Sequence, residues 1–346
     1  MSTWLDFLVK QGARFAPPAS RVQAFGDAVA EPARTNFVAP LTHLGLIAAS
    51  GEDAAHFLHN QLTNDVEHLP ADEARIAGYC TPKGRLLADL LMWKNGDDIM
   101  LQLPRDIQPG VQKRLQMFIL RAKAKLADVS EQRAVLGLAG PAVASALMPW
   151  FPLLPLAIYG KVESEAGILI RHPNAFETPR YQWITSNDTA IAAWPALTEV
   201  LQASGADAWE LAEIDSGVPH ITATTQEQFV PQMINFELIG GVNFKKGCYP
   251  GQEIVARSQY LGKLKRRMLR ASVPSAAIVP GAEIFSSDDP AQPCGMIVNA
   301  VRTSADEADC LVEIKLAAAD SEIRLGSADG PILAFKTLPY PLTDPV

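Results

Sequence analysis

The sequence predicts an α+β fold with two related αβ subdomains that have antiparallel sheets, followed by a C-terminal β-barrel. Between residues 36 and 240, helical patterns alternate with strand patterns, and Asn95-Gly96 between two of the strands is typical of a hairpin turn. The order of elements in the first half of this range resembles that in the second half, which indicates an internal duplication. After Leu264 the pattern changes to short strands separated by turns rich in Ser, Asp, Pro and Gly, as in a small barrel.

These patterns divide the chain into four regions. We expect an N-terminal extension over residues 1–35, an αβ body over 36–240, a linker over 241–264 and the barrel over 265–346. The body is expected to contain subdomains of about residues 36–130 and 131–240.

In the extension, a short helix over residues 4–11 is predicted, and the first subdomain then begins with a strand over 43–49. Apolar residues at helical spacing follow over 52–63, with acidic residues in the first turn, where they complement the helix dipole. The other elements of this subdomain are strands over 74–79, 85–93 and 99–103, a helix over 111–122 and a strand over 124–129.

The second subdomain and the barrel follow from the same kind of pattern. Gly217-Val218-Pro219 ends the last helix of the body. The elements of the second subdomain are strands over 134–138, 168–171 and 181–185 and helices over 142–150, 190–202 and 210–216. The barrel strands are expected over 268–271, 283–285, 295–301, 310–314 and 332–335.

Composition points to a cytoplasmic protein with reduced thiols and no membrane association. No apolar run approaches the roughly 18 residues of a membrane-spanning helix, and the first residues lack the basic region and apolar core of a secretory signal. The four cysteines show no C-x-x-C spacing, so neither a disulfide framework nor a zinc site is indicated. His56 and His59 form the one close helical histidine pair, which is at best half of a metal site, and we predict no metal.

Charge is distributed unevenly along the chain, whose formal net charge is −8. Residues 242–270 contain eight basic residues and one acidic residue, a net charge of +7, so the rest of the chain carries −15. A basic band on an acidic protein suggests an anionic ligand at that place. A solvated surface band ahead of a strand explains the same charge equally well.

The basic band contains residues 243–257, which we call the signature segment. Pro250 suits the first turn of a helix, which would make Tyr249 the N-cap and place Cys248 just ahead of the helix, beside Lys245 and Lys246. A thiol in that position is expected to ionise more easily than a free cysteine. A lone cysteine is more often a small buried apolar residue, and that alternative stays open at this point.

The segment from Lys246 to Glu253, Lys-Gly-Cys-Tyr-Pro-Gly-Gln-Glu, resembles the K-G-C-Y-x-G-Q-E signature of the YgfZ family. Residues 61–66 and 82–89 also resemble elements of the related glycine-cleavage T-protein, GcvT. The resemblance covers roughly residues 36–342. It implies a GcvT-like fold that binds tetrahydrofolate or another folate. It also implies as partners the iron–sulfur enzymes that the family helps to maintain, including enzymes that modify tRNA.

The resemblance assigns roles to seven residues. Trp209 matches a tryptophan implicated in folate binding, and a flat pterin stacks well on an indole. Asp215 falls where relatives place a carboxylate that can accept two parallel N–H bonds from the pterin. The remaining assignments are Cys248 as the functional thiol, Lys245, Lys246 and Arg257 as cations for the glutamate tail, and Asp89 as a polar group of the cleft. For Trp209 a place in the core, and for Asp89 and Asp215 a place at the surface, are the ordinary alternatives.

Two other functions remain open from the sequence. A T-protein-like aminomethyltransferase would carry a pair of acids where this chain has Ala88-Asp89, so the missing acid counts against that activity. An RNA-binding module would use the basic band, but such modules interleave aromatic residues with the charge, and Phe244, Tyr249 and Tyr260 are the few candidates.

Overall fold

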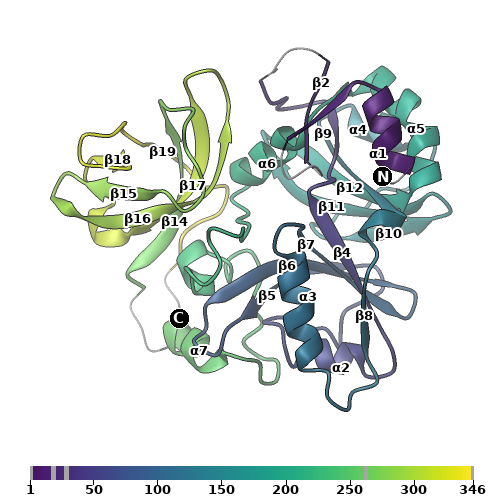
Figure 1. Cartoon of the computed structure of the whole chain (residues 1–346), viewed down its shortest axis with the longest axis horizontal. Helices are drawn as coiled ribbons and strands as arrows, with labels where there is room; N and C mark the ends of the chain where they lie inside the picture. The colour runs from purple at the N-terminus through teal and green to yellow at the C-terminus, as the bar shows by residue number, and fades with distance from the viewer. Residues whose placement is uncertain (1–2, 17–20, 27–30, 261–263, 344–346) are drawn as a thin grey trace. The chain divides into compact units, whose positions relative to one another are not determined.

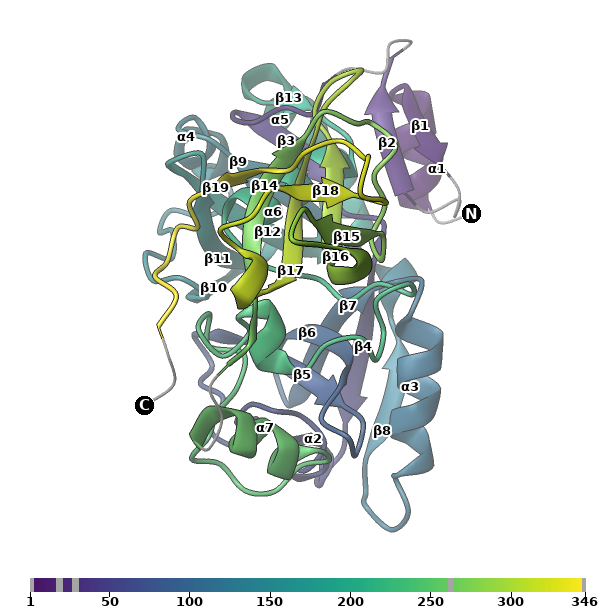
Figure 2. The same cartoon turned by 90° about the vertical axis from the view of Figure 1, so that its left-hand side faces the viewer.

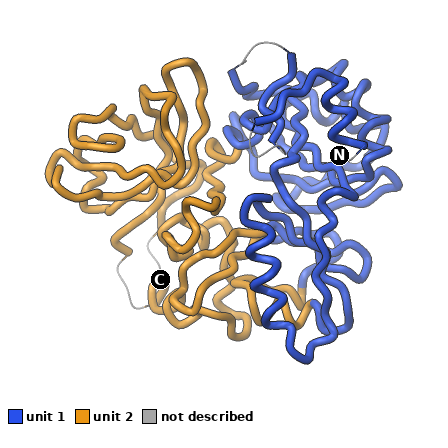
Figure 3. The backbone as a smooth tube through the Cα atoms, viewed as in Figure 1, with its two compact units in different colours: residues 1–54, 69–75, 91–212 blue, residues 55–68, 76–90, 213–346 orange. Residues whose placement is uncertain are grey.

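A computed structural model describes residues 3–16, 21–26, 31–260 and 264–343. Within these ranges the chain forms two compact units (Figure 3). Unit 1 comprises residues 1–54, 69–75 and 91–212, and unit 2 comprises residues 55–68, 76–90 and 213–346, apart from the residues outside the described ranges. No helix in the described ranges has both the length and the apolar character that crossing a membrane requires.

The first αβ subdomain is built on a five-stranded sheet of order β5-β6-β7-β4-β8. Its elements along the chain are β4 (Leu44–Ser50), α2 (Ala54–His59), β5 (Ala74–Cys80), β6 (Leu86–Asn95), β7 (Asp98–Pro104), α3 (Gln108–Met117) and β8 (Lys125–Asp128). The predicted hairpin is confirmed, because β6 and β7 pair antiparallel around a turn in which Gly96 has a φ of 61°. Helix α3 lies alongside β8 in Figures 1 and 2.

The second subdomain is built on a six-stranded sheet of order β10-β11-β12-β9-β3-β13. Its elements are β3 (Phe37–Pro40), η1 (Ser130–Gln132), β9 (Arg133–Ala139), α4 (Val143–Leu147), β10 (Lys161–Ser164), β11 (Gly167–Ala175), β12 (Thr178–Ser186), α5 (Asn187–Val200), β13 (Gln202–Ala203) and α6 (Ala206–Asp215). From β4 and from β9 the chain runs through the same order of strand, helix, three strands, helix and strand. The strands also take corresponding places in the two sheets, except that β3 stands between β9 and β13.

The N-terminal residues pack onto the second subdomain within unit 1. Helix α1 (Thr3–Lys10) precedes a two-stranded sheet of β1 (Ala13–Ala16) and β2 (Arg21–Phe25). The helix contacts α5 (Figure 1). Between these helices, Trp4 and Trp194 meet edge to face with their ring centroids 5.8 Å apart. Trp4 and Leu8 are buried in the same apolar cluster as Trp183 and Leu197, so the helix adds to the core of the sheet that it covers.

The C-terminal residues of unit 2 form a curled six-stranded sheet of order β18-β15-β16-β17-β14-β19. Its elements are β14 (Arg266–Val273), β15 (Glu283–Ser286), β16 (Asp289–Arg302), β17 (Ala308–Lys315), η3 (Leu316–Ala318), β18 (Ile323–Leu325) and β19 (Ala334–Lys336), and η2 (Pro231–Ile234) and α7 (Gln252–Tyr260) precede them. Just before β19, Leu333 N–H donates to Ile323 O at 2.8 Å, and Leu325 N–H donates to Pro331 O at 2.9 Å. These bonds join the segment before β19 to β18, so the sheet curls back on itself.

The predicted fold class is therefore confirmed, with corrections to single elements. The predicted helix over residues 52–63 ends at His59, because Thr63 bonds instead to the backbone of Gly78 and Gly241. The predicted helix over 111–122 occupies Gln108–Met117, since Pro109 fits the first turn and starts the helix earlier. The sequence did not predict the short strands β1, β2, β3, β10, β13 and β18, and β3 lies in the sheet of the second subdomain, although its residues were assigned to the first.

One buried ion pair links the connector before the signature segment to the barrel. Arg267 on β14 and Glu237 form an ion pair, and both side chains are at most 4% exposed. Arg267 also donates to Gln232 O at 3.1 Å and to Thr343 O at 2.8 Å.

We expect Arg267→Met to reduce the free energy of unfolding by about 3–5 kcal/mol, since it leaves a buried carboxylate without its partner. Unfolding in urea measures the change. Arg267→Met combined with Glu237→Leu should recover part of it, and a double variant less stable than the single one would contradict this explanation.

Candidate functional site

The signature segment packs closely against the turn that follows β5. Gly251 has a φ of 82°, and a Cβ at this position would lie 2.4 Å from Thr81 O and 2.6 Å from Gly84 Cα. Any larger residue would therefore collide with the backbone of that turn. Because a left-handed residue cannot lie inside a helix, α7 begins at Gln252, and Gly251 O accepts the N–H of Val255 at 3.2 Å. The prediction of Tyr249 as the N-cap is wrong, and Gly251 takes that place.

Lys246 points into unit 2 and binds the end of helix α2. Its Nζ donates to His59 O and to Leu62 O, the latter at 2.8 Å. These carbonyls lie at and just beyond the C-terminus of α2, where helices leave carbonyl groups without partners and favour a cation. Burial lowers the pKa of Lys246 from 10.5 to about 8, against the opposing effect of Asp65.

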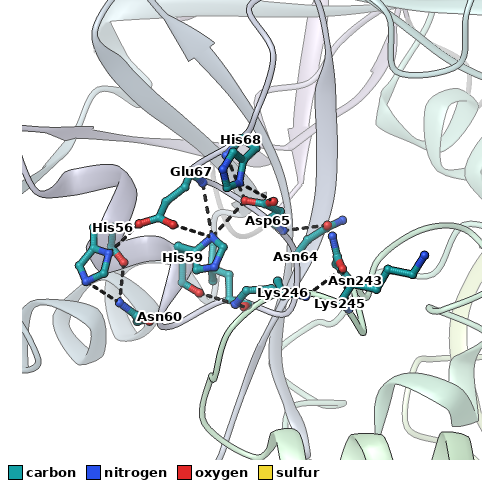
Figure 4. Close-up of polar contacts among 11 residues, drawn as sticks. His56, His59, Asn60, Asn64, Asp65, Glu67, His68, Asn243, Lys245 and Lys246 are labelled. Carbon is teal, nitrogen blue, oxygen red and sulfur yellow. Dashed lines mark hydrogen bonds and ion pairs between the residues drawn. The ribbon is translucent and has the colours of Figure 1, made fainter.

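Asn243 turns the backbone so that the two lysines diverge. Its Oδ1 accepts the N–H of Lys245 at 2.8 Å and of Lys246 at 3.1 Å, and its own N–H donates to Thr63 O at 2.9 Å. Figure 4 shows Lys246 extending toward α2 and Lys245 extending away from it. Lys245 and Arg257 are exposed, and in the described part of the chain neither forms an ion pair. Only these two cations of the segment are thus free to meet a ligand directly.

A histidine–carboxylate network lies behind the Lys246 contact (Figure 4). His59 Nδ1 is 3.1 Å from Asp65 Oδ1 and 3.8 Å from Glu67 Oε2, and His59 is buried. Burial acts to raise the pKa of Asp65. Hydrogen bonds from His68 and the charge of His59 outweigh this effect and keep that pKa below its ordinary value. A hydrogen bond from His56 likewise lowers the pKa of Glu67. Across the described ranges no three or more His, Cys, Asp or Glu side chains are grouped as metal ligands.

Cys248 differs from the other cysteines in its exposure. Its side chain is exposed, whereas Cys80, Cys294 and Cys310 are buried. Burial raises the pKa of Cys80 and of Cys310 to about 12 and also raises that of Cys294. Since α7 begins at Gln252, Cys248 lies four residues ahead of the helix and not directly at its first turn, which corrects the predicted position.

One of the two predicted acids, Asp89, lies in a second polar cluster of unit 2. Asp89 on β6 accepts the N–H of Ile221 at 2.6 Å, and its Oδ2 is 2.7 Å from His220 Nδ1. His220 Nε2 is 3.9 Å from Glu213 Oε2 at the end of α6. The backbone of His220 is fixed by Asn299 on β16, whose side-chain amide accepts from its N–H and donates to its carbonyl, both at 2.9 Å. We call Asp89, Glu213, His220 and Asn299 the His220 cluster.

Asp215, at the C-terminus of α6, bonds to the barrel. Arg270 Nη1 on β14 donates to Asp215 Oδ1 at 2.5 Å and to Asp215 O at 2.9 Å, and both side chains are about one-fifth exposed. Sequence analysis placed Arg270 in the basic band but predicted no partner for this arginine.

Sequence analysis did not single out His220. The one available signal was its position directly after the Gly217-Val218-Pro219 helix stop, close to two acids.

Trp209 belongs to unit 1 and is 2% exposed. The Arg180 guanidinium lies 4.7 Å from the centre of its ring, and His172 meets it edge to face at 5.0 Å. A Cβ on Gly137 of β9 would lie 2.4 Å from the indole. Protein groups thus cover the indole ring on several sides. A pterin could stack on the ring only if the Arg180 guanidinium moved away from it.

Comparisons with known proteins agree with this architecture. Residues 22–154 match the model of the GCVT N-terminal domain. The chain is 32% identical to a protein of Photorhabdus laumondii, with 87% of this chain and 91% of the relative covered, and 30% identical to one of Colwellia psychrerythraea, with 88% and 94% covered. Both relatives are described as tRNA-modifying protein YgfZ. The crystal structure of glycine cleavage system aminomethyltransferase T from Bartonella henselae has the same fold, with a TM-score of 0.75 over 98% of this chain and 97% of that one, at 17% identity.

The exposure of Cys248 predicts a single reactive thiol in the native protein. Brief treatment with iodoacetamide should give one adduct per chain, on Cys248, because the other three thiols are buried and have raised pKa values. Mass spectrometry of the intact protein and of its peptides would show this. Cys248→Ser should give no adduct until urea is added. An adduct on Cys80 or Cys310 in the native protein would contradict the described packing.

The depressed pKa of Lys246 predicts a pH effect on stability. Between pH 8 and about 10.4, the unfolded chain holds a proton on this amine that the folded chain has lost, so its contribution to stability rises with pH. Between about pH 8 and 9.5, the free energy of unfolding of wild type should therefore rise by about 1–2 kcal/mol relative to that of Lys246→Met. Urea unfolding at several pH values measures this difference. Groups common to both proteins cancel in this difference. If the free energies of unfolding of the two proteins changed in parallel with pH, Lys246 would have to stay charged over this whole pH range.

Proposed function

This chain belongs to the YgfZ family, and from that premise we propose that it is a folate-binding accessory protein that supports iron–sulfur enzymes and tRNA modification. The observation that carries the proposal is the signature segment. Lys246 and Gly251 fix its backbone on unit 2, while Cys248, Lys245 and Arg257 stay exposed. A rigid backbone that presents a thiol and two cations suits a site for an anionic ligand.

Folate is the ligand class that the charges support best. A reduced folate carries N–H groups on its pterin and carboxylates on its glutamate tail, so it needs acceptors at one end and cations at the other. Unit 2 supplies carboxylates in Asp215 and the His220 cluster, and free cations in Lys245 and Arg257. Lys246 is committed to the carbonyls of α2, so we propose that it aids tail binding by holding the segment and through its long-range charge.

We propose that the pterin ring uses Trp209, as the family resemblance implies. The Arg180 guanidinium lies 4.7 Å from the centre of the indole, and this contact supports the proposal that a flat, electron-poor group can bind this face. A pterin would take the place of Arg180 at the ring. That exchange requires movement of Arg180 and so links folate binding to strand β12, on which Arg180 lies.

We propose that Cys248 acts in a step after folate binding, as the thiol through which the protein serves its client enzymes. Its exposure suits contact with another macromolecule, whereas the three buried thiols are unavailable for such contact. The relatives described as tRNA-modifying proteins make enzymes of tRNA modification the first clients to test.

Aminomethyl transfer is the less supported alternative. Ala88 is fully buried beside Asp89, so the chain has a methyl group where a T-protein-like acid pair would have its other carboxylate. The likeness to aminomethyltransferase T is a likeness of fold at 17% identity. An RNA-binding module is supported only by the basic band, part of which is committed to internal contacts through Lys246, Arg267 and Arg270.

Calorimetry with tetrahydrofolate tests the proposal directly. Wild type and Cys248→Ala should bind with the same affinity, because the thiol acts later. Asp215→Asn should weaken binding by about tenfold, since an amide cannot accept two N–H bonds as a carboxylate does. Trp209→Phe, which keeps a ring in the core, should bind more weakly than wild type while remaining folded at the temperature of the measurement, although the smaller ring lowers its stability.

The controls separate loss of binding from loss of folding. Arg302→Ala removes an exposed arginine of β16 outside the proposed site and should leave the affinity unchanged. Absence of any heat of binding with folded wild type would overturn the folate proposal. RNA would then be the next ligand to test against the basic band.

A further inference from the structure

We propose that unit 1 holds a second binding site, for a carboxylate with an apolar body, in a cavity beneath helix α1. Medium-chain fatty acids are the simplest ligands of this class. The cavity has a volume of about 580 Å³, within the roughly 300–1,000 Å³ typical of small-molecule sites. It lies where the N-terminal residues meet strands β4 and β9 of the two subdomains.

The walls of the cavity are mainly apolar. Helix α1 and β1 contribute one side, and the starts of β4 and β9 contribute the other. The residues that define it are Trp4, Val9, Phe15, Leu44, Leu46 and Val135. Val9 is 52% exposed. An apolar ligand in the cavity would bury part of this exposed apolar surface, which favours binding.

Two residues that line the cavity, Trp4 and Thr42, carry buried donor atoms without a protein partner. The indole Nε1 of Trp4 and the hydroxyl Oγ1 of Thr42 are both buried, and neither forms a hydrogen bond within the described ranges. Buried polar groups in native proteins are nearly always paired, with protein, water or ligand. Trp4 as a whole is 3% exposed, so bulk water does not satisfy its N–H. A ligand oxygen in the cavity would supply the missing acceptor once the side chain of Trp4 or Thr42 turns its donor toward it.

The charges at the cavity favour a single negative charge on the ligand. Arg105 Nη2 lies 2.5 Å from Glu131 Oε1, so these two lining residues neutralise each other. Arg133 also lines the cavity, is exposed, and forms no ion pair with any residue in the described ranges. One uncompensated cation beside apolar walls matches a monocarboxylate. A ligand with several phosphates would lack partners there.

Calorimetry of full-length protein with decanoate tests this site. We expect one decanoate per chain. Arg133→Ala should weaken binding by about tenfold, the effect of losing one charge-assisted hydrogen bond, and neutral decan-1-ol should bind wild type correspondingly weakly. Leu44→Trp, at a partly exposed lining position, should fill the cavity and abolish binding while circular dichroism stays unchanged. The matched control Arg302→Ala, on the barrel, should bind like wild type.

Three results would overturn the inference. The first is no decanoate binding up to about 1 mM, which would mean that only water fills the cavity. The second is wild-type binding by folded Leu44→Trp, which would place the ligand elsewhere. The third is competitive displacement of decanoate by tetrahydrofolate, which would make the cavity part of the folate site. Because folate binding is measured separately, failure of this inference leaves the proposed function intact.

Discussion

The contact between Lys246 and the C-terminus of α2 is the constraint on which the signature segment depends. Helix α2 has only six residues, too few to be stable on its own, and its last carbonyls need donors from elsewhere. The Lys246 ammonium supplies two hydrogen bonds to these carbonyls from a position nearly 200 residues away in sequence. Because the side chain of Lys246 is held in the interior by these bonds, the side chains of the neighbouring Lys245 and Cys248 are exposed.

A close approach of two backbones completes this arrangement. Gly84 has a φ of 71°, and a Cβ there would lie 2.9 Å from the Cβ of Ile254 in α7, while Gly251 meets Thr81 and Gly84 from the other side. The two glycine-containing motifs that stood out in the sequence, near residue 84 and near residue 251, therefore contact each other. Each glycine is required by the close approach of the other segment, which gives a structural reason for both.

The sequence predicted the fold class well because periodicity reports burial within single elements. It predicted the Asn95-Gly96 hairpin from turn chemistry alone, and Leu264 as the approximate start of the barrel. It placed the end of α2 four residues too late, because Thr63 leaves the helix for contacts with Gly78 and Gly241 that no local pattern contains. Strand β18 is three residues long with an arginine at its centre, so neither alternation nor length distinguished it from a turn.

The candidate site was predicted less completely for the same reason. Cys248, Lys245 and Arg257 were predicted together because they share one segment. His220 became visible only when β6, α6 and β16 brought Asp89, Glu213 and Asn299 around it. The internal duplication makes the point physically. The two copies share their order of elements, yet the first carries the histidine–carboxylate network after α2, whereas the residues after α4 expose Leu153, Leu156 and Ile158. The sheets of the two subdomains correspond, whereas the segments after the first helix differ. The chemistry of the first subdomain therefore depends on a segment that the shared order of elements does not predict.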